Sequence, residues 1–459
     1  MDDLLDGQDM TGVALAIRSG EVAPADVLEA TMKRIAERDL SVNAIAELCE
    51  NVPAPADGPL AGVPFGIKDL GVQVAGMHNR DGSRLFADRV SMADSEIVAR
   101  YRAAGLVIVA TTKTPELGKA PTTEPVLGGP ARNPYRLTHS PGGSSGGTGA
   151  AVAAGMLAAG HGNDGGGSIR IPASMCGLVG LKPTRGRTPW WPKPIAFSYP
   201  VGINHALTRS VRDSASLLDI AAATDRRFLD EVGAPPGRLR IALALEAPHG
   251  APTHPDCRAA AERAGQLLES LGHTVEPVEP DWPVDAVRNA LNTIMSAALV
   301  VDVDSRLATL GRDLEPDDLE PMTLMMYDAA EQMPASALVR ALHDVDRAAR
   351  VMDAFHEAFD LLLTPTVSQP VPALGLIDTT NPASIIEHAA SYAAITGVAN
   401  VTGQPAISLP LATDSTGMPC GVQLTARCNG EDLLLRVASQ LEHAQPWSIA
   451  PVWPARGDT

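Results

Sequence analysis

The chain has 459 residues, of which 45% are hydrophobic and 20% charged, and this composition predicts a folded globular protein and excludes a disordered one. Its net charge of −18 repels the phosphates of nucleic acids and anionic lipid surfaces, so we expect neither as a partner. The N-terminus is acidic where a signal peptide needs bases, and no apolar run approaches the ~18 residues that span a bilayer. These features predict a cytoplasmic protein.

The five cysteines are scattered and include no Cys-x-x-Cys pair. This pattern predicts buried free thiols and argues against a disulfide framework or a zinc cage. His249, His254 and Cys257 lie close in sequence, but in a segment broken by prolines, and we interpret them as surface residues. We expect no metal and no cofactor.

Residues 11–38 are predicted to be helical, because Pro24 suits a first helical turn and apolar residues follow at helical spacing. Apolar runs at 62–68 and 106–110 predict buried strands, and the segment 94–104 between them predicts a helix. Such alternation is typical of an α/β sheet.

From about residue 225 to 358 the chain becomes acidic and helical in pattern, which predicts a helical insertion over the sheet. Strand signals return at 361–365 and 405–410, and a last helix is predicted near 430–443. Three methionines of the insertion are predicted to lie in its core: Met322, Met325 and Met326.

Two glycine-rich clusters, 140–149 and 162–170, flank an alanine-rich helix. Phosphate binding is disfavoured, because no lysine follows Gly147 as a P-loop requires. The segment 142–146 matches the G-x-S-x-G of a nucleophile elbow, but the buried strand that such an elbow needs does not precede it. A third interpretation is a serine nucleophile in the second cluster, where consecutive glycines let several N–H groups converge into an oxyanion hole.

A serine nucleophile needs a base. His139 and His161 stand near the clusters without a patterned carboxylate partner, and we interpret both as bystanders. The period of two along 62–68 instead places Lys68 on the face of Pro64 and Gly66, among small residues near the interior of the sheet. A lysine in such a place serves as a base when burial keeps it neutral.

Together these segments resemble the amidase signature family, whose members hydrolyse amides with a serine, cis-serine and lysine triad. The resemblance rests on residues 143–147, 164–173 and 177–184, with flanking matches in family order. It covers most of the chain and weakens between about 225 and 355.

The resemblance implies an α/β fold, a single domain over residues 1–459, with a central mixed, twisted β-sheet covered by helices on both faces. The signature core is expected at about 60–215 and a variable helical insertion on the substrate side at about 225–358. The chain is then expected to return to the sheet at about 359–459.

Carried over by position, the resemblance implies that Ser168 is the nucleophile, Ser144 the bridging serine after a cis peptide bond, and Lys68 the base. Six neighbours are implied to form or support the oxyanion hole, the first three through backbone N–H groups: Gly165, Gly166, Gly167, Asp164, Ser145 and Arg170. The relay requires a neutral amine, so the pKa of Lys68 must fall by several units from ~10.4 through burial. Asp69 is expected on the opposite face, away from that amine.

The family more often has hydroxyl residues where this chain has Asn163 and Gly165, so the loop is expected to be held differently here. Trp190 and Trp191, with Phe197 and Tyr199, gather after the signature block, where they would either wall an acyl or aryl pocket or pack in the core.

The resemblance implies an amidase that cleaves small or aryl amides through a Ser168 acyl-enzyme, with carbamates and esters as further candidates. One alternative is a glutaminase subunit of a tRNA-dependent amidotransferase. Another is a non-catalytic binding relative, which would be expected to have lost a triad residue, whereas all three are present. The sequence leaves the amide substrate open, together with the oligomeric state, a homodimer included, and the roles of Trp190, Trp191 and the insertion.

Overall fold

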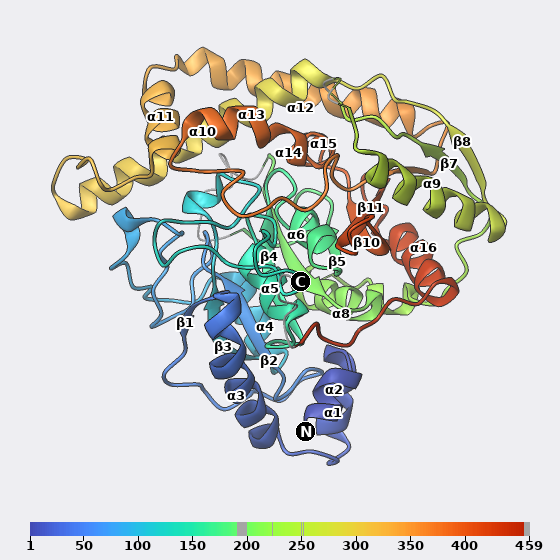
Figure 1. Cartoon of the computed structure of the whole chain (residues 1–459), viewed down its shortest axis with the longest axis horizontal. Helices are drawn as coiled ribbons and strands as arrows, with labels where there is room; N and C mark the ends of the chain where they lie inside the picture. Colours follow the sequence, from blue (N-terminus) through green and yellow to red (C-terminus); the bar gives the residue numbers. More distant parts are fainter. Residues whose placement is uncertain (191–199, 223, 249, 251, 454–459) are drawn as a thin grey trace.

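The structure is a computed structural model that describes residues 1–190, 200–222, 224–248, 250 and 252–453 (Figure 1). Within these ranges, eleven strands form one sheet in the order β1-β3-β2-β4-β6-β5-β10-β11-β9-β7-β8. Strand β2 runs parallel to β3 and β4, and β7 runs parallel to β8 and β9, whereas the other neighbours are antiparallel. The predicted mixed α/β sheet is confirmed.

The strands have these bounds: β1 Ile45–Leu48, β2 Pro64–Lys68, β3 Val107–Thr112, β4 Ala159–Asp164, β5 Val179–Lys182, β6 Ile203–Thr208, β7 Arg240–Leu243, β8 Thr274–Pro277, β9 Leu361–Pro365, β10 Ala406–Thr413 and β11 Pro419–Ala426. The helices have these bounds: α1 Asp2–Gly7, α2 Met10–Arg18, α3 Pro24–Val42, α4 Glu96–Ala103, α5 Gly146–Ala153, α6 Arg170–Met175, α8 Val211–Ala222, α9 Pro255–Ser270, α10 Val284–Leu310, α11 Pro321–Glu331, α12 Ala335–Phe355, α13 Pro382–His388, α14 Ala390–Ala393, α15 Thr396–Thr402 and α16 Glu431–Ala444. Three short 3-10 helices complete the set: η1 Arg84–Phe86, η2 Glu116–Gly118 and η3 Phe228–Glu231.

Helices cover both faces of the sheet, because alternate residues of each strand point to opposite sides. On β3, Ile108 joins a core cluster with residues of α2, α4 and α8, whereas Val107 and Val109 join one with residues of α5 and α6. On β9, Leu363 packs in a cluster with α9 and α16, and Leu362 in one with α10 and α12. Figure 1 shows the sheet between these two groups of helices.

The N-terminal helical region divides into two helices. Asp9 caps α2 by accepting a hydrogen bond from the N–H of Gly12, and α2 ends at Arg18. Pro24 then occupies the first turn of α3, as its position predicts. Further along the chain, the predicted strands and helix at 361–365, 405–410 and 430–443 appear as β9, β10 and α16.

The segment 225–358 is not wholly helical, which corrects the sequence prediction. It begins with β7, which pairs with β9, and continues to β8, so this segment supplies one edge of the sheet. Each of these strands has four residues, too few to reveal a period of two in the sequence. Helices α10, α11 and α12 follow and run along the top of the molecule in Figure 1.

The methionine prediction is partly wrong. Met322 and Met326 are partly buried against core clusters, but Met325 is 39% exposed on α11. The five cysteines are free thiols, three buried and two half-buried: Cys176, Cys257, Cys420, Cys49 and Cys428. His254 caps α9 by accepting from the N–H of Asp256, whereas His249 lies outside the described residues.

None of the helices described above combines the length and the apolar character needed to cross a bilayer. Among the same residues, no group of three His, Cys, Asp or Glu side chains is arranged to hold a metal ion.

Candidate active site

Lys68 ends β2 and is completely buried. Its Nζ lies 2.6 Å from Oγ of Ser144 and donates a hydrogen bond of 2.7 Å to Oδ1 of Asn163. Burial lowers the pKa of Lys68 well below its ordinary value, and the charges of Asp164 and Asp81 only partly oppose this. The arrangement therefore favours a neutral amine in contact with a serine hydroxyl.

The period of two along β2 explains why Lys68 meets Ser144. Phe65 and Ile67 pack in the cluster with α2 and α4. Gly66 faces the other side, where an added Cβ would meet Leu157, a member of the cluster with α5. Lys68 shares that side with Gly66, and Ser144 stands two residues before α5 on the same side.

Asp69 begins the loop after β2 and is held by partners of its own. It accepts hydrogen bonds from the backbone N–H of Arg80 at 2.8 Å and from the side chain of Asn79 at 3.3 Å. Burial raises the pKa of Asp69 to about 7. The charges that most oppose the lowered pKa of Lys68 come from Asp164 and Asp81, which agrees with the expectation that Asp69 faces elsewhere.

Ser144 follows a cis peptide bond with Gly143, as the family resemblance implies. Glycine is required at 143, because an added Cβ would lie 2.4 Å from the backbone oxygen of Thr122 and 2.6 Å from its nitrogen. The segment before α5 is thus packed directly against the backbone of residues 120–122.

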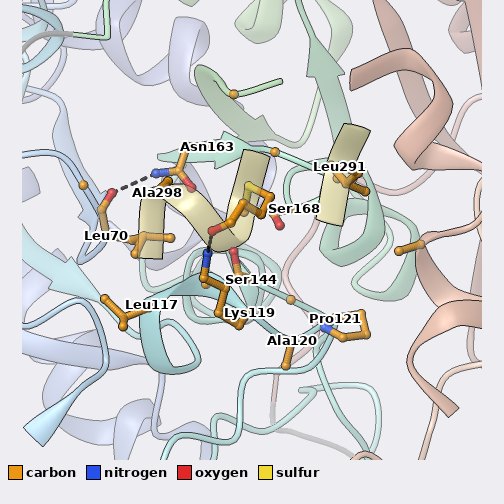
Figure 2. A pocket seen from close by; sticks show the side chains of 18 of the residues that line it. Leu70, Leu117, Lys119, Ala120, Pro121, Ser144, Asn163, Ser168, Leu291 and Ala298 are labelled. Carbon is orange, nitrogen blue, oxygen red and sulfur yellow. Dashed lines mark hydrogen bonds between the residues drawn. The ribbon is translucent and has the colours of Figure 1, made fainter. Parts of the chain in front are cut away.

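Ser168 lies in the loop between β4 and α6 and lines the same cavity as Ser144 (Figure 2). The two glycine-rich clusters are joined here, because the backbone N–H of Ser145 donates to the carbonyl oxygen of Ser168 at 3.1 Å. The hydroxyl of Ser145 also donates to the carbonyl oxygen of Asn163. Ser145 therefore ties the bridging serine's segment to the loop of Ser168.

The loop of Ser168 is folded around the carboxylate of Asp164. This carboxylate accepts hydrogen bonds from the backbone N–H groups of Gly167 and Ile169 and from the guanidinium of Arg170. Burial alone would raise the pKa of Asp164, but the charge and hydrogen bonds of Arg170 outweigh it and bring that pKa to about 2. The carboxylate is therefore ionised and fixes the shape of the loop.

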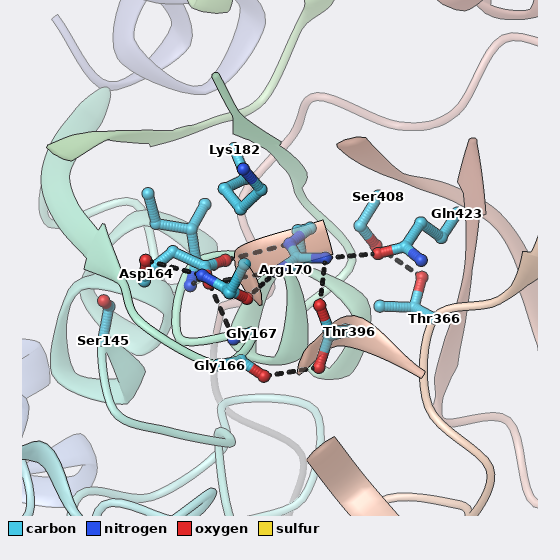
Figure 3. Close-up of polar contacts among 12 residues, drawn as sticks. Ser145, Asp164, Gly166, Gly167, Arg170, Lys182, Thr366, Thr396, Ser408 and Gln423 are labelled. Atoms are coloured by element: carbon cyan, nitrogen blue, oxygen red, sulfur yellow. Dashed lines mark hydrogen bonds and ion pairs between the residues drawn. The ribbon is translucent and has the colours of Figure 1, made fainter. Parts of the chain in front are cut away.

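Arg170 anchors this loop to α15 and β11. Its remaining N–H groups donate to the carbonyl oxygen of Thr396, to Oε1 of Gln423 and to Oδ1 of Asn400, and the side chain is completely buried (Figure 3). Three segments far apart in sequence thus hold the loop.

The oxyanion-hole prediction needs a correction at Gly167. Gly165 and Gly166 line the cavity beside Ser168, but the N–H of Gly167 is donated to Asp164 at 2.7 Å. Gly167 also has a φ of 131°, and an added Cβ there would lie 2.2 Å from Oγ1 of Thr396. This glycine is therefore needed for the turn of the loop and not for binding an oxyanion.

The cavity in front of the serines has a volume of about 250 Å³ and a mostly apolar lining (Figure 2). Six of its apolar residues come from five separate segments: Leu70, Leu117, Ile171, Trp190, Leu291 and Met295. Trp190 therefore contributes to the pocket wall, whereas Trp191, Phe197 and Tyr199 lie outside the described residues.

Helix α10 of the insertion covers the glycines of the loop. An added Cβ at Gly165 would lie 3.6 Å from Met295, and one at Gly166 would lie 3.6 Å from Leu291. Lys119 links α10 to the other wall by donating to the carbonyl oxygen of Met295 at 2.9 Å. The insertion thus forms part of the wall next to the reacting group.

Sequence reasoning assigned no contact to Asn163 and did not identify α10 as a wall of the site. An amide side chain directly before Asp164, in a strand next to that of Lys68, was the available signal for Asn163. The position of α10 left no such signal, because spacing along a helix does not say which surface it meets.

The two histidines near the clusters are engaged away from the serines. His161 is buried in β4, its Nε2 lies 3.2 Å from Oδ1 of Asn204, and burial lowers its pKa to about 3. His139 contacts Thr138 through Nδ1. Neither histidine lines the cavity in the described structure.

Comparison with known proteins agrees with the geometry. The sequence matches the family model Amidase over residues 26–435, which is most of the chain. The chain belongs to the amidase signature family.

Two relatives of this amidase signature protein show how far the similarity extends. The 6-aminohexanoate-cyclic-dimer hydrolase of Paenarthrobacter ureafaciens is 38% identical, with 96% of this chain and 95% of that protein covered. The putative amidase AmiC of Mycobacterium tuberculosis is also 38% identical, with 98% and 97% covered.

Solved structures give the same result. The 6-aminohexanoate cyclic dimer hydrolase complexed with substrate has a TM-score of 0.92 at 36% identity and covers 99% of this chain and 100% of its own. A polypeptide of the glutamyl-tRNA(Gln) amidotransferase of Thermotoga maritima has a TM-score of 0.79 at 27% identity, covering 94% and 95%. The amidase signature protein is an enzyme that hydrolyses amide C–N bonds.

Proposed function

We propose that this chain is a serine amidase in which Ser168 attacks the amide carbonyl, Ser144 relays the proton and Lys68 is the base. The observation that carries the proposal is the contact of 2.6 Å between Nζ of a completely buried lysine and Oγ of Ser144, in the wall of a cavity that Ser168 shares. A buried amine without its proton is a competent general base.

In the acylation step, the neutral amine of Lys68 takes a proton from Ser144, which takes one from Ser168. The oxygen of Ser168 bonds to the carbonyl carbon and gives a tetrahedral oxyanion. When the C–N bond breaks, the relayed proton passes through Ser144 to the departing nitrogen, which leaves as the free amine. Water then loses a proton to the same relay, attacks the acyl-enzyme and releases the acid and Ser168.

The oxyanion is held by backbone N–H groups of the loop. Gly165 and Gly166 carry no side chain on the cavity side and are adjacent to Ser168, so their N–H groups and that of Ser168 are the proposed donors. Asp164 and Arg170 act as positioning residues that hold the loop in this shape.

The proposed substrates are small uncharged amides with apolar flanks, either aryl amides or amides of alkyl chains. A lining of leucine, isoleucine, methionine and tryptophan removes apolar surface from water but offers few partners for charged groups. The cyclic dimer of 6-aminohexanoate is a suitable candidate, since relatives of this chain are named as its hydrolases. Carbamates and esters of similar size would pass through the same acyl-enzyme.

A substrate panel tests this proposal. It contains a 4-nitroacetanilide-type anilide, a linear alkyl amide, the cyclic dimer of 6-aminohexanoate, a carbamate, an ester and glutamine. We expect the wild type to hydrolyse apolar amides with the highest kcat/KM, and glutamine poorly, because its ammonium and carboxylate would be desolvated against an apolar wall.

The matched variants are Ser168→Ala and Ser270→Ala, the second at an exposed serine at the end of α9. Ser168→Ala is expected to lose activity on every substrate by at least ~10³-fold, whereas Ser270→Ala retains it. Mass spectrometry after reaction with a slow ester should detect an acyl group on the peptide of Ser168. Equal rates for wild type and Ser168→Ala would refute the mechanism, and a preference for glutamine would favour the glutaminase alternative.

A further inference from the structure

Asn163 bridges the proposed base and the wall of the cavity. It is the fifth residue of β4, it is 5% exposed, and it lines the cavity beside Ser144. Its Oδ1 accepts a hydrogen bond of 2.7 Å from Nζ of Lys68, and its Nδ2 donates one of 2.8 Å to the carbonyl oxygen of Leu70 (Figure 2). One side chain therefore contacts both Lys68 and the loop that follows it.

The contact with Leu70 determines which way the amide points. A backbone carbonyl oxygen only accepts hydrogen bonds, so the group of Asn163 that faces Leu70 must be the NH₂. The oxygen of the amide consequently faces Lys68. Asn163 thus presents Lys68 with an acceptor that carries no charge and cannot donate.

This geometry has a consequence for a neutral amine, which has two N–H donors and one lone pair. With one N–H committed to Asn163, rotation about the Cε–Nζ bond is restricted, and the lone pair is free to face Oγ of Ser144 at 2.6 Å. We propose that Asn163 is a positioning residue that orients the neutral amine of Lys68 toward Ser144 without adding a charge that would keep the amine protonated. This inference rests on the proposed function, since it assigns Asn163 to the same relay.

The charged groups around Lys68 are engaged with other partners. Asp164, next to Asn163 on β4, is paired with Arg170 at 2.9 Å, and Asp81 is paired with Arg89 at 2.6 Å.

Two further titratable groups lie close to Lys68, and each has its own partner. Asp69 accepts from the backbone N–H of Arg80. His161, also on β4, contacts Asn204. Asn163 is thus a neutral partner of Nζ in a region where the acidic groups are directed elsewhere.

The test compares three variants at position 163 by pH profiles of kcat/KM and kcat on the best amide of the panel. Asn163→Asp replaces the neutral acceptor by a carboxylate at the same distance from Lys68. We expect the acidic limb of kcat/KM to move to higher pH by about 1 to 3 units, because an adjacent opposite charge stabilises the ammonium. Activity should be low at pH 7 and recover at alkaline pH.

Asn163→Leu is the matched variant, because it keeps the volume and, like Asn163→Asp, loses the donor to Leu70. It removes the acceptor without adding charge. We expect kcat to fall by at least ~10-fold with little change in KM and no upward movement of the acidic limb, because orientation is lost while the amine stays neutral. Asn163→Ser, which restores an uncharged acceptor, should recover part of kcat.

Thermal unfolding of each variant separates these effects from misfolding, since a merely structural role would lower the Tm and kcat of the Asp and Leu variants alike without moving the acidic limb in one of them. An unmoved limb in a folded Asn163→Asp variant would overturn the inference. That outcome is distinct from failure of the proposed function, in which Ser168→Ala would keep wild-type activity.

Discussion

Nζ of Lys68 lies 2.6 Å from Oγ of Ser144, and neither side chain has more than 1% of its surface exposed. The two residues come from separate elements, the end of β2 and the segment before α5, and they meet on one side of the sheet. Burial lowers the pKa of Lys68, so a contact that would be a solvated ammonium at the surface becomes an amine available as a base.

Replacing Lys68 by arginine is expected to abolish activity. A guanidinium stays protonated at all accessible pH values, so Lys68→Arg keeps a positive charge at the site but removes the base. We expect kcat/KM to fall by at least ~10³-fold at every pH between 6 and 10. In the wild type, kcat/KM should decline toward acidic pH as Lys68 becomes protonated, with the decline centred well below the ~10.4 of a free lysine. Steady-state rates across that range measure both effects.

The control for that substitution is Lys33→Arg, at a lysine whose side chain is 70% exposed and pairs with Glu37 on α3. This variant should retain the wild-type pH profile. Substantial activity of Lys68→Arg would contradict the assignment of Lys68 as the base.

Shortening Met295 on α10 is expected to widen the range of amides accepted. Its side chain lies over Gly165, next to the carbonyl of a bound amide in the proposed mechanism. For Met295→Ala we expect kcat/KM for an anilide with a bulky acyl group to rise by about 10-fold relative to the acetyl anilide, since one or two methylenes in an apolar pocket are worth about 1–3 kcal/mol.

Val303→Ala is the matched control on the same helix, because Val303 is buried in the cluster with Leu85 and Phe86 and does not line the cavity. It should lower the Tm without changing the ratio of the two rates. A change of that ratio in Val303→Ala but not in Met295→Ala would mean that α10 acts through stability and not through the pocket wall.

Much of the site was accessible from sequence because it is local. The period of two along β2 predicts the side on which Lys68 lies, and two glycine-rich clusters predict where backbone N–H groups converge. The misassigned residue, Gly167, differs from its neighbours only through a hydrogen bond to Asp164, three residues away, which glycine content does not reveal. Likewise, β7 and β8 are recognisable as strands only through their pairing with β9 and with each other.

Removing the charge of Asp164 is expected to destabilise the protein strongly. Asp164 and Arg170 are both completely buried and 2.9 Å apart, so Asp164→Asn would leave the guanidinium of Arg170 without its counter-charge. Breaking one partner of such a pair costs about 3–5 kcal/mol. Urea unfolding followed by circular dichroism measures this loss. As a comparison, Asp285→Asn removes the partner of Arg288 in an exposed pair and should change the free energy of unfolding by less than about 1 kcal/mol, so equal losses would contradict the prediction.

Glu116 connects the segment beside Ser144 to the insertion. Its carboxylate accepts hydrogen bonds from the hydroxyl of Ser83 and from the backbone N–H of Glu320, both at 2.7 Å. Burial, with a contribution from the charge of Glu320, raises the pKa of Glu116 to about 7. Because the ordinary value is 4.5, the folded protein holds a proton here that the unfolded chain has already released between these two pH values.

This difference makes Glu116 a source of pH-dependent instability. The unfolded state binds fewer protons at this residue between about pH 4.5 and 7, so the stability that Glu116 allows is present below that range and falls as pH rises to 7, by about 3 kcal/mol in all. Glu116→Gln keeps the shape and cannot ionise, so its free energy of unfolding should rise relative to wild type between pH 5 and pH 8, as measured by urea unfolding at both values. Glu21→Gln, at an exposed glutamate, should give the same difference from wild type at both pH values. If Glu116→Gln also differed from wild type by a constant amount, the carboxyl of Glu116 would have to be ionised in the folded protein throughout.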